Sequence, residues 1–279
     1  MSKTWFITGT SRGFGREWAI AALERGDKVA ATARNATSLD DLVATYGDAV
    51  LPIALDVTDR VAVGAAVTRA AEHFGRIDVA VNNAGYGHFG VVEEVTEDEV
   101  RAQLETNVFG ALWVTQAVVP VMRSQGGGHI LQVSSIGGIM AAPTLGIYSA
   151  SKWALEGFSQ SLAAEVADFG IKVTIIEPGA FATDWGGASA TFSQPLHAYD
   201  DFRNGTVAAL RKAMAAAPAG DPAATRGPVL ELVDTENPPL RVLFGNGVLA
   251  RAVAEYESRL ATWREWEPLS KAAHGDVTS

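Results

Sequence analysis

Three side chains near the middle of the chain have the types and spacing needed for acid/base chemistry. Tyr148 and Lys152 are four residues apart at the start of a predicted helix, so both point to one face. A free tyrosine has a pKa of about 10, which a neighbouring ammonium lowers by favouring the phenolate. Tyr148 could then exchange a proton with a carbonyl or alcohol oxygen that Ser135 holds. The same spacing is common in helices, so the pair alone leaves a purely structural role open.

A glycine-rich segment near the N-terminus has the composition of a phosphate-binding turn. It follows an apolar strand-like run and precedes a helical pattern, with the spacing Gly-x-x-x-Gly-x-Gly. Glycine allows a sharp turn and close approach to a ligand, and a helix start directs free N–H groups at a pyrophosphate. An ordinary turn with incidental glycines is the alternative. The residues expected to bind a dinucleotide here are Gly9, Ser11, Arg12, Gly13, Phe14 and Gly15.

The end of the second predicted strand indicates which dinucleotide is bound. A site for NAD usually has an acidic residue here for the ribose 2′-hydroxyl, whereas a site for NADP accommodates the 2′-phosphate with arginine. This strand ends in Arg34, with no acid, and Arg12 could reach the same phosphate. The predicted cofactor is therefore NADP(H), with NAD(H) less favoured. The alternative is that both arginines are ordinary surface residues.

Two further strand ends carry residues suited to the same cofactor. Asp56 could accept a hydrogen bond from the adenine amino group, or it could cap the following helix. Asn83, Ala84 and Gly85 would let the cofactor ribose lie against the backbone, or they could form a plain turn.

The elements that must position these residues alternate along the chain. Short apolar runs are separated by longer segments with helical periodicity, which predicts an α/β fold with a doubly wound parallel sheet and helices on both faces. The predicted strands are 4–8, 28–33, 51–56, 78–82, 129–134, 172–177 and 241–244, and the predicted helices are 14–25, 59–73, 97–123, 149–169 and 199–217.

The whole chain, 1–279, is expected to form one Rossmann-fold domain. Residues 185–240 lose the regular alternation and gain Gly, Pro and Ala, so we interpret them as an insertion that covers the substrate. A C-terminal helix is predicted over 247–266, and 268–279 are expected to be a loose tail.

Composition excludes several classes of function. The chain has 279 residues, a formal net charge of −10 and no cysteine, so disulfides, thiolate catalysis and cysteine-ligated metals are ruled out. No metal site is expected, and the acidic charge argues against nucleic acid as a partner. No apolar run is long enough for a membrane span, and no signal pattern opens the chain, so a cytoplasmic location is expected.

Taken together, these residues resemble the short-chain dehydrogenase/reductase family in its single-domain branch. The resemblance covers residues 4 to about 185 and rests on the glycine loop, Asn82-Asn83-Ala84-Gly85, Asn107, Ser135, Tyr148-x-x-x-Lys152, Pro178-Gly179 and Thr183. It implies a seven-stranded parallel sheet and hydride transfer between a nicotinamide and the substrate carbon. The protein supplies position and a proton, while the cofactor supplies the redox chemistry.

The resemblance also implies roles that spacing alone does not. Lys152 would hold the nicotinamide ribose, as would the phenol of Tyr148, and Asn107 would bind a water that relays protons from Lys152. The backbone of Val57 would lie beside the adenine. The remaining cofactor contacts implied in this way are Pro178, Gly179, Phe181 and Thr183.

The residues expected to enclose the substrate are mostly apolar. Such a wall suits a hydrophobic ketone or aldehyde, of aryl, alicyclic or steroid/retinoid-like type, and its alcohol. Several of them could instead be ordinary core residues, and His88 could be a simple loop histidine. The expected wall is Tyr86, His88, Phe89, Ile136, Ile139, Met140, Leu145, Phe181, Trp185 and Phe192.

Two other functions remain open on the same fold. A nicotinamide-dependent epimerase or dehydratase usually has Gly-x-x-Gly-x-x-Gly and a larger C-terminal domain, and this chain has neither. A non-catalytic dinucleotide-sensing protein would not need Ser135, Tyr148 and Lys152 together. The expected small-molecule partner is a hydrophobic carbonyl compound or its alcohol. The resemblance also implies a homodimer or homotetramer.

Overall fold

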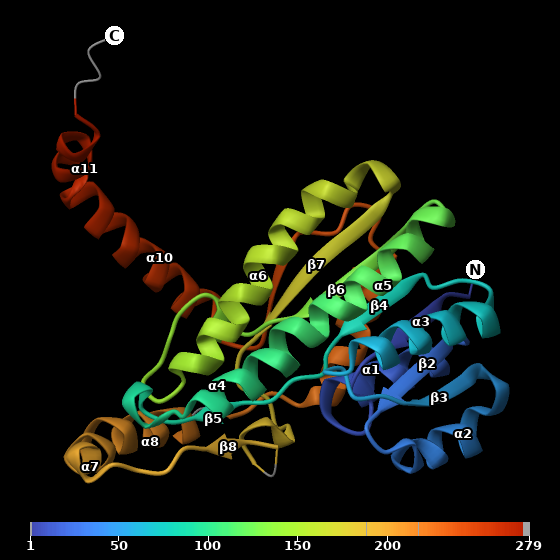
Figure 1. The fold of residues 1–279 in the computed structure, drawn as a ribbon, viewed down its shortest axis with the longest axis horizontal. Coiled ribbons are helices and arrows are strands. Elements are labelled where there is room, and N and C mark those ends of the chain that lie inside the picture. The colour runs from blue at the N-terminus through green and yellow to red at the C-terminus, as the bar shows by residue number, and fades with distance from the viewer. Residues whose placement is uncertain (1, 188, 217, 276–279) are drawn as a thin grey trace.

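A seven-stranded parallel sheet forms the centre of the protein. The computed structural model describes residues 2–187, 189–216 and 218–275, and Figure 1 gives its arrangement. In the order in which they lie in the sheet, the strands are β3 (Val50–Ala54), β2 (Lys28–Ala33), β1 (Thr4–Ile7), β4 (Val79–Asn82), β6 (Gly128–Val133), β7 (Ile171–Pro178) and β9 (Arg241–Phe244). The predicted fold class is confirmed.

The strand order reverses beside β1. The chain runs outward from β1 through β2 to β3 and then returns to place β4 on the other side of β1. In open parallel sheets ligands bind at such a switch point, outside the carboxyl ends of the strands. The glycine loop after β1 and the small residues after β4 therefore meet at the same place.

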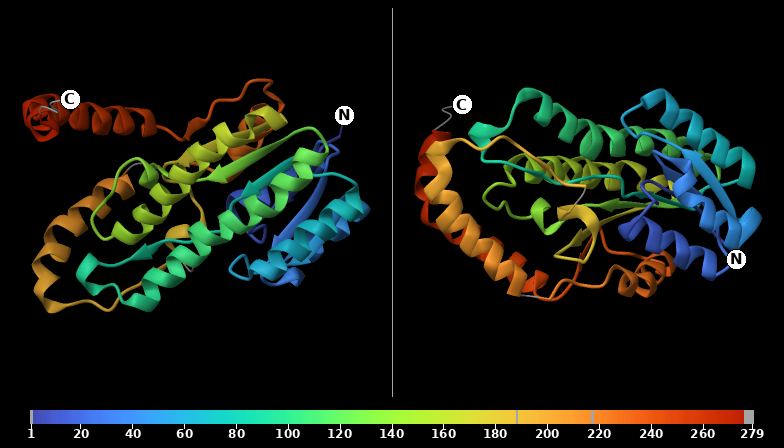
Figure 2. Two further views of the ribbon diagram at one scale, coloured as in Figure 1. Left: turned by 45° about the horizontal axis from the view of Figure 1, so that its top comes forward. Right: turned by 90° about the horizontal axis from the view of Figure 1, so that it is seen from below.

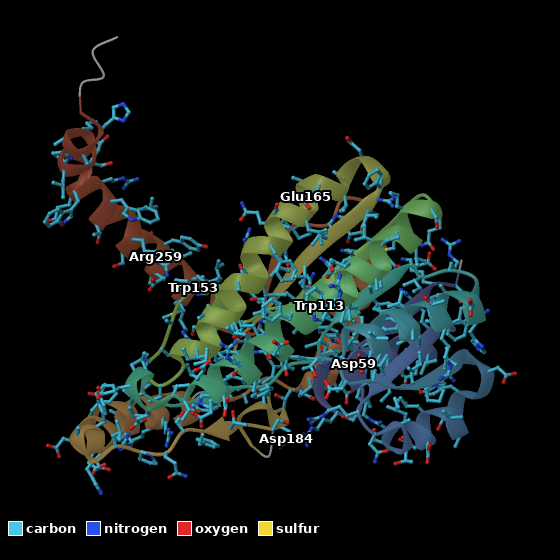
Figure 3. The ribbon with its side chains drawn as sticks, viewed as in Figure 1. Asp59, Trp113, Trp153, Glu165, Asp184 and Arg259 are labelled. Carbon is cyan, nitrogen blue, oxygen red and sulfur yellow. The ribbon has the colours of Figure 1, made fainter. Side chains whose placement is uncertain are left out.

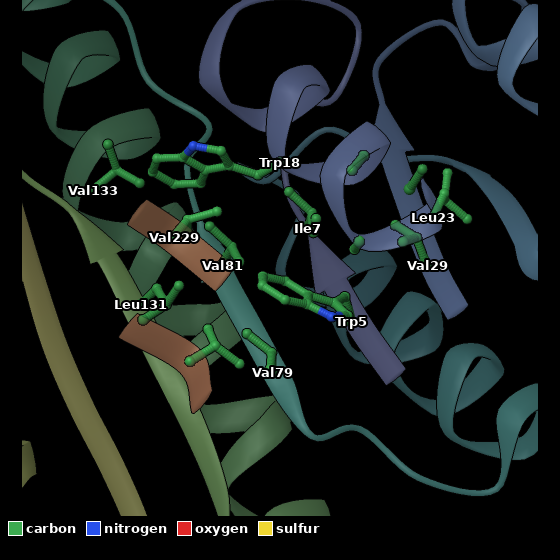
Figure 4. Packing of buried hydrophobic residues seen from close by; sticks show 14 of the residues in the cluster. Trp5, Ile7, Trp18, Leu23, Val29, Val79, Val81, Leu131, Val133 and Val229 are labelled. Carbon is green, nitrogen blue, oxygen red and sulfur yellow. The ribbon is translucent and has the colours of Figure 1, made fainter. Parts of the chain in front are cut away.

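Alternating side chains of the strands supply two hydrophobic layers. Trp5 and Ile7 of β1 face one layer, and Phe6 faces the other, as the two-residue period of a strand requires. The first layer packs against α1 (Gly13–Glu24), α2 (Asp40–Tyr46) and α9 (Arg226–Asp234). Figure 4 shows Trp18 and Leu23 of α1 and Val229 of α9 in this layer. The second layer packs against α3 (Arg60–Phe74), α5 (Ala111–Ser124) and α6 (Gly146–Val166).

The helix predicted over 97–123 is interrupted. It consists of α4 (Glu97–Leu104), a π-helical segment (Glu105–Gly110) and α5. A similar break divides the region predicted as one helix over 199–217 into α7 (Asp200–Phe202), a π-helical segment (Arg203–Val207) and α8 (Ala208–Ala216), while Ala217 lies outside the described residues. One continuous helix was predicted for each region, without these wider turns.

The expected insertion, 185–240, divides into two parts. Its first part contains β8 (Thr191–Phe192), which pairs with β5 (His88–Phe89), followed by α7 and α8. Its second part contains α9, whose Val229 and Leu232 belong to the first core layer. Thr225, just before α9, accepts a hydrogen bond from Trp18 Nε1 at 2.7 Å. The second part therefore supports α1, whereas the first part lies beside β5.

The C-terminal region extends further as a helix than predicted. After α10 (Val248–Glu265) comes α11 (Glu267–His274), where a loose tail was expected, and residues 276–279 lie outside the described part. Figures 1 and 2 show both helices extending away from the sheet. In Figure 3, Arg259 and Trp153 lie close together near the base of this extension, where the guanidinium is 5.2 Å from the indole centroid. No described helix is long and apolar enough to cross a membrane.

Candidate active site

The glycine loop forms a tight turn between β1 and α1. Gly9 and Gly13 have φ values of +71° and +60°, which favour glycine over residues with a side chain. A Cβ on Gly15 would lie 2.5 Å from the carbonyl oxygen of Gly9, so the loop could not close with a larger residue there. Arg12 occupies the N-cap of α1 without a side-chain cap, and the first turn contains no acid. This helix start therefore fits an anion.

Asn83 fastens the glycine loop to the end of β4. Its Nδ2 donates to the carbonyl oxygens of Thr8 at 2.8 Å and Gly9 at 3.0 Å. In return, the Thr8 hydroxyl accepts hydrogen bonds from the backbone N–H groups of Asn83 and Ala84. The Asn83 side chain is thus occupied in shaping the turn, so its contribution to a cofactor site is through the backbone and the loop it holds.

A cavity of about 1350 Å³ runs along the carboxyl ends of the strands. It begins at the glycine loop, passes the ends of β2 and β3, and reaches the start of α6. The predicted residues that line it are Gly9, Ser11, Arg12, Gly13, Phe14, Arg34, Asp56, Val57, Asn83, Ala84, Gly85, Tyr86, Phe89, Ser135, Ile136, Met140, Leu145, Tyr148, Lys152, Pro178, Gly179, Phe181, Thr183 and Trp185. These predicted residues therefore lie around one continuous cavity.

Tyr148 and Lys152 lie side by side at the inner end of this cavity. Lys152 Nζ is 5.9 Å from the centroid of the Tyr148 ring and donates to the carbonyl oxygen of Val133 at 2.8 Å. Burial raises the pKa of Tyr148 to about 12, and a hydrogen bond with the Ser135 side chain acts in the opposite direction. The sequence predicted a lowered pKa for this phenol, but its enclosure raises the pKa and outweighs the hydrogen bond with Ser135.

Lys152 is shifted by the same enclosure. Burial lowers its pKa to about 8, and the carboxylate of Glu156 partly offsets this. Ser135 lies at the end of β6, where its hydroxyl also accepts the N–H of Gly137 at 3.0 Å. The phenol, the ammonium and the hydroxyl are thereby gathered at one end of the cavity, as a proton-transfer site requires.

Asn107 lies in the π-helical segment between α4 and α5. Its Nδ2 donates to the Tyr86 carbonyl at 3.0 Å and to Ser151 Oγ at 3.1 Å, and its Oδ1 accepts the N–H of Tyr86 at 3.1 Å. Asn107 is buried behind Gly85, whose added Cβ would lie 3.0 Å from Asn107 Oδ1 and 3.7 Å from Lys152 Nζ. It joins α6 to the strand end after β4, next to Lys152, without lining the cavity.

The two predicted phosphate-binding arginines differ in their surroundings. Arg34 is exposed at the edge of the cavity, and within the described residues no ion pair or side-chain hydrogen bond involves it. Arg12 instead forms an ion pair with Asp184 and donates to Ser189 Oγ at 2.6 Å. The sequence did not single out Asp184 or Ser189, because the partners are far apart along the chain and no local pattern links them.

The two residues beyond β3 have different environments. Asp56 Oδ1 accepts hydrogen bonds from the backbone N–H and the hydroxyl of Thr58, at 3.0 and 2.8 Å, while Asp59 caps α3. Val57 is buried, and its side chain lies against Gly110, where an added Cβ would come within 2.6 Å of it. Asp56 therefore holds its own turn and is exposed at the cavity edge, with Val57 as the apolar floor beside it.

Beyond β7, the predicted nicotinamide contacts lie along one wall. The N–H of Gly179 donates to the Phe244 carbonyl at 2.9 Å, which ties this wall to the end of β9. Phe181 packs edge-on against Phe14, with centroids 4.9 Å apart. Thr183 lies over Gly13. These contacts connect the glycine loop with the start of the inserted segment.

Aromatic side chains close the inner end of the cavity. The Trp185 indole lies 4.9 Å from the Tyr148 ring and 5.5 Å from Phe89, measured between centroids. With Ile136, Met140 and Leu145 they make this end largely apolar.

Three residues of the predicted wall lie elsewhere. His88 is buried between Thr191 Oγ1 and Ser193 Oγ, each 2.8 Å from a ring nitrogen, and burial lowers its pKa. It joins β5 to β8 and is not among the residues that line the cavity. Phe192 stacks on Phe89 from outside and is 58% exposed, and Ile139 is buried in the core. His88 is paired with Thr191 and Phe192 with Phe89, and it is Thr191 and Phe89 that line the cavity.

Comparison with known proteins supports the family suggested by these residues. Residues 3–192 match the family model described as short chain dehydrogenase. The chain is 44% identical over 280 residues to an oxidoreductase of Botryotinia fuckeliana, covering 98% of this chain and all of that one. It is also 44% identical over 177 residues to a 3-ketodihydrosphingosine reductase of Bacteroides thetaiotaomicron, covering 63% of each.

Solved structures agree on the fold. A short-chain dehydrogenase from Streptomyces avermitilis superposes with a TM-score of 0.90 at 41% identity, covering 98% of this chain and 99% of that one. An alcohol dehydrogenase from Thermococcus sibiricus, solved with 5-hydroxy-NADP, gives 0.71 at 26% identity, covering 88% and 96%. A 3-ketoacyl-(acyl-carrier-protein) reductase from Brucella melitensis, solved with NADH, gives 0.75 at 27% identity, covering 88% and 98%. Together with the matched residues 3–192, these likenesses establish that the chain belongs to the short-chain dehydrogenase family.

Proposed function

We propose that this oxidoreductase uses NADP(H) to interconvert a hydrophobic ketone or aldehyde and its alcohol. The observation that carries the proposal is the position of Tyr148, enclosed beside Lys152 and Ser135 at the apolar end of a cavity that begins at a phosphate-binding turn. The bound nicotinamide would supply or accept the hydride. The protein's own side chains would donate and accept the proton.

The residues for this cofactor fit its chemistry along the whole cavity. The uncapped start of α1 offers N–H groups to a pyrophosphate, and Arg34 stands exposed where a 2′-phosphate would need a cation. Arg12 would also bind the 2′-phosphate once its ion pair with Asp184 is broken. Asp56 and Val57 would lie beside the adenine, and Lys152 and Tyr148 beside the nicotinamide ribose. The roles of Pro178, Gly179, Phe181 and Thr183 as further contacts are part of the same proposal.

In ketone reduction, Ser135 would hold the carbonyl oxygen while Tyr148 donates its proton to it. Lys152 would favour the resulting phenolate through its charge. Asn107, next to Lys152, would provide the path by which that proton is restored. Trp185 and Phe89 would shield the reacting carbonyl from water and select apolar substrates.

The test is consumption of NADPH with a panel of aryl, alicyclic and aliphatic ketones, with polar aldoses as the comparison. Tyr148→Phe is expected to lower kcat by about 10²–10⁴-fold with nearly unchanged binding of NADPH. Equal consumption by both proteins would overturn the role of Tyr148, and no consumption by the wild type with any ketone would favour an epimerase, a dehydratase or a sensing protein. Faster turnover of aldoses than of aryl ketones would overturn the substrate class. We also propose that the protein is cytoplasmic and that it forms a homodimer or a homotetramer.

A further inference from the structure

A buried polar cluster lies behind Lys152 and draws on four parts of the fold. It consists of Ser134, at the end of β6, Glu156 of α6, Glu177 of β7 and Arg241 of β9. Ser134 Oγ donates to Glu156 Oε1 at 2.7 Å. Arg241 Nε lies 3.2 Å from Glu156 Oε2 and 3.4 Å from Glu177 Oε1. None of the steps attributed to Tyr148 or Ser135 uses these side chains.

The cluster places two carboxyl groups where burial disfavours their charge. Glu156 and Glu177 are 6% and 2% exposed. Burial, followed by the nearby Glu156 carboxylate, raises the pKa of Glu177 to about 8. Burial and the neighbouring carboxylate thus favour the protonated form of Glu177, while Glu156 is the carboxylate that Ser134 and Arg241 contact.

Glu156 is connected to both sides of the proposed proton-transfer site. It is one helical turn beyond Lys152 on α6, so the two side chains share a face. It also lies under the turn that follows Ser135, because a Cβ on Gly138 would be only 2.4 Å from Glu156 Oε1 and 2.5 Å from Ser134 Oγ. A single carboxylate thus lies one helical turn from Lys152 and contacts the turn that follows Ser135.

We propose that Glu156 is a positioning residue, whose carboxylate, fixed by Ser134 and Arg241, keeps Lys152 protonated and holds the turn that carries Ser135. Its importance for catalysis rests on the proposed function, but its effect on Lys152 does not. Among the described residues, the titratable groups that face Lys152 are Tyr148, whose ring centroid is 5.9 Å away, and Glu156, and behind Glu156 lie Glu177 on β7 and Arg241 on β9. Glu156 contacts Arg241 directly and lies one helical turn from Lys152, on which its charge acts at longer range.

The direct test is an NMR titration of the Lys152 ammonium without cofactor, with the signal assigned from Lys152→Met. Glu156 raises the pKa of this ammonium from a value that burial depresses. Glu156→Gln keeps the shape and the acceptor for Ser134 but removes the charge. It should therefore lower the pKa of Lys152 by about one unit. Glu156→Asp retains the charge and should stay closer to the wild type.

Glu165→Gln is the matched control, because Glu165 is an exposed residue further along α6 that accepts a hydrogen bond from Ser161. It should leave the titration unchanged. An unchanged Lys152 titration in folded Glu156→Gln would overturn the proposal, as would an equal shift in Glu165→Gln. If Glu156→Gln does not fold, Ser134→Ala should lower the pKa of Lys152 by a smaller amount, and no change in that variant would equally overturn it.

The second readout is the pH dependence of kcat/KM for ketone reduction. Because Lys152 in Glu156→Gln would lose its proton at lower pH, the decline of activity on the alkaline side should move down by the same amount as the NMR titration. A merely structural role would lower activity at all pH values without this displacement. If the NMR shift occurs but the wild type reduces no ketone, the proposed function fails and the role of Glu156 toward Lys152 stands.

Discussion

Tyr148 and Lys152 are both almost completely enclosed, and enclosure disfavours the charged form of each. Their identities and their four-residue spacing could be predicted from the sequence, because one helical turn fixes both. Their depth of burial could not, since it depends on Trp185 and on strand ends distant in the chain. The direction of the Tyr148 shift was therefore predicted wrongly from the neighbouring charge alone.

Arg34 provides a prediction about cofactor choice. Arg34→Ala should weaken NADPH binding by about 10–100-fold, because a charge-assisted hydrogen bond to the 2′-phosphate contributes about 1.5–3 kcal/mol. NADH lacks that phosphate, so its dissociation constant should change little. Fluorescence titration with both nucleotides measures the difference. Arg69→Ala, an exposed arginine of α3, is the control. Equal weakening toward NADH and NADPH would contradict the assignment of Arg34.

His129 provides a prediction about acid stability. Its pKa is lowered to about 3 by burial and by Lys172 and Lys3, while Nε2 lies 2.9 Å from Thr174 Oγ1. The unfolded chain, with an ordinary histidine pKa near 6.5, takes up the proton first as the pH falls. The neutral histidine therefore contributes stability above about pH 6.5 that is lost progressively toward pH 3.

The check is urea unfolding of the wild type and His129→Asn at pH 7 and pH 5. His129→Asn is expected to be less stable at pH 7 but to lose less free energy of unfolding on acidification. Parallel losses in the two proteins would show that another group is responsible for the acid sensitivity.

At the scale of elements, the parallel sheet was predictable because each strand is an apolar run bounded by turn residues. The interruption between α4 and α5 was not, although it carries Asn107 to its position beside Gly85. The helix α9 was missed because its Gly and Pro resemble a loop, and only packing against α1 reveals its role in the core. The pairing of β5 with β8 was also not predicted, and it leaves Thr191 and Phe89 lining the cavity in place of His88 and Phe192.

Trp185 and Phe192, both in the inserted segment, provide a matched pair. Trp185→Ala removes the ring that covers Tyr148, so the KM for a bulky aryl ketone should rise by roughly 2–10-fold, as expected for losing an aromatic contact. Phe192→Ala removes a ring that stacks on Phe89 outside the cavity and should have a smaller effect. Steady-state kinetics with one aryl and one small aliphatic ketone test this. A larger rise in KM for Phe192→Ala than for Trp185→Ala would argue against Trp185 as the residue that covers Tyr148.

On the scale of the whole molecule, α10 and α11 contribute little to the described core. Val248 and Ala252 are buried at the base of α10, but every described residue from 261 onward is exposed, including Trp263 and Trp266. The sequence predicted a helix here from its periodicity. It could not indicate that the helix leaves the body, because that depends on what the apolar side chains meet.

Removal of residues 262–279 should therefore leave the thermal midpoint within about 2 °C of the full chain at low concentration, since the described residues among them, 262–275, are all exposed. Differential scanning calorimetry measures the midpoint, and light scattering of the same samples measures mass. A truncation before Val248 is the contrasting variant and should destabilise the protein, because it exposes Gly179 and Phe244. A large loss of stability on the shorter deletion would mean that the distal helix packs against something.

The position of β9 at the sheet edge has a consequence for synthesis on the ribosome. All the residues proposed to bind cofactor and exchange protons have been added by Trp185, yet the strand that brings Arg241 to Glu156 comes about 60 residues after β7. At roughly 5–20 residues per second, the nascent chain spends several seconds with every reactive group present and the last strand missing. During that interval Glu156 and Glu177 lack their cation. We therefore expect the nascent protein to acquire its native protonation states only when its final strand is added.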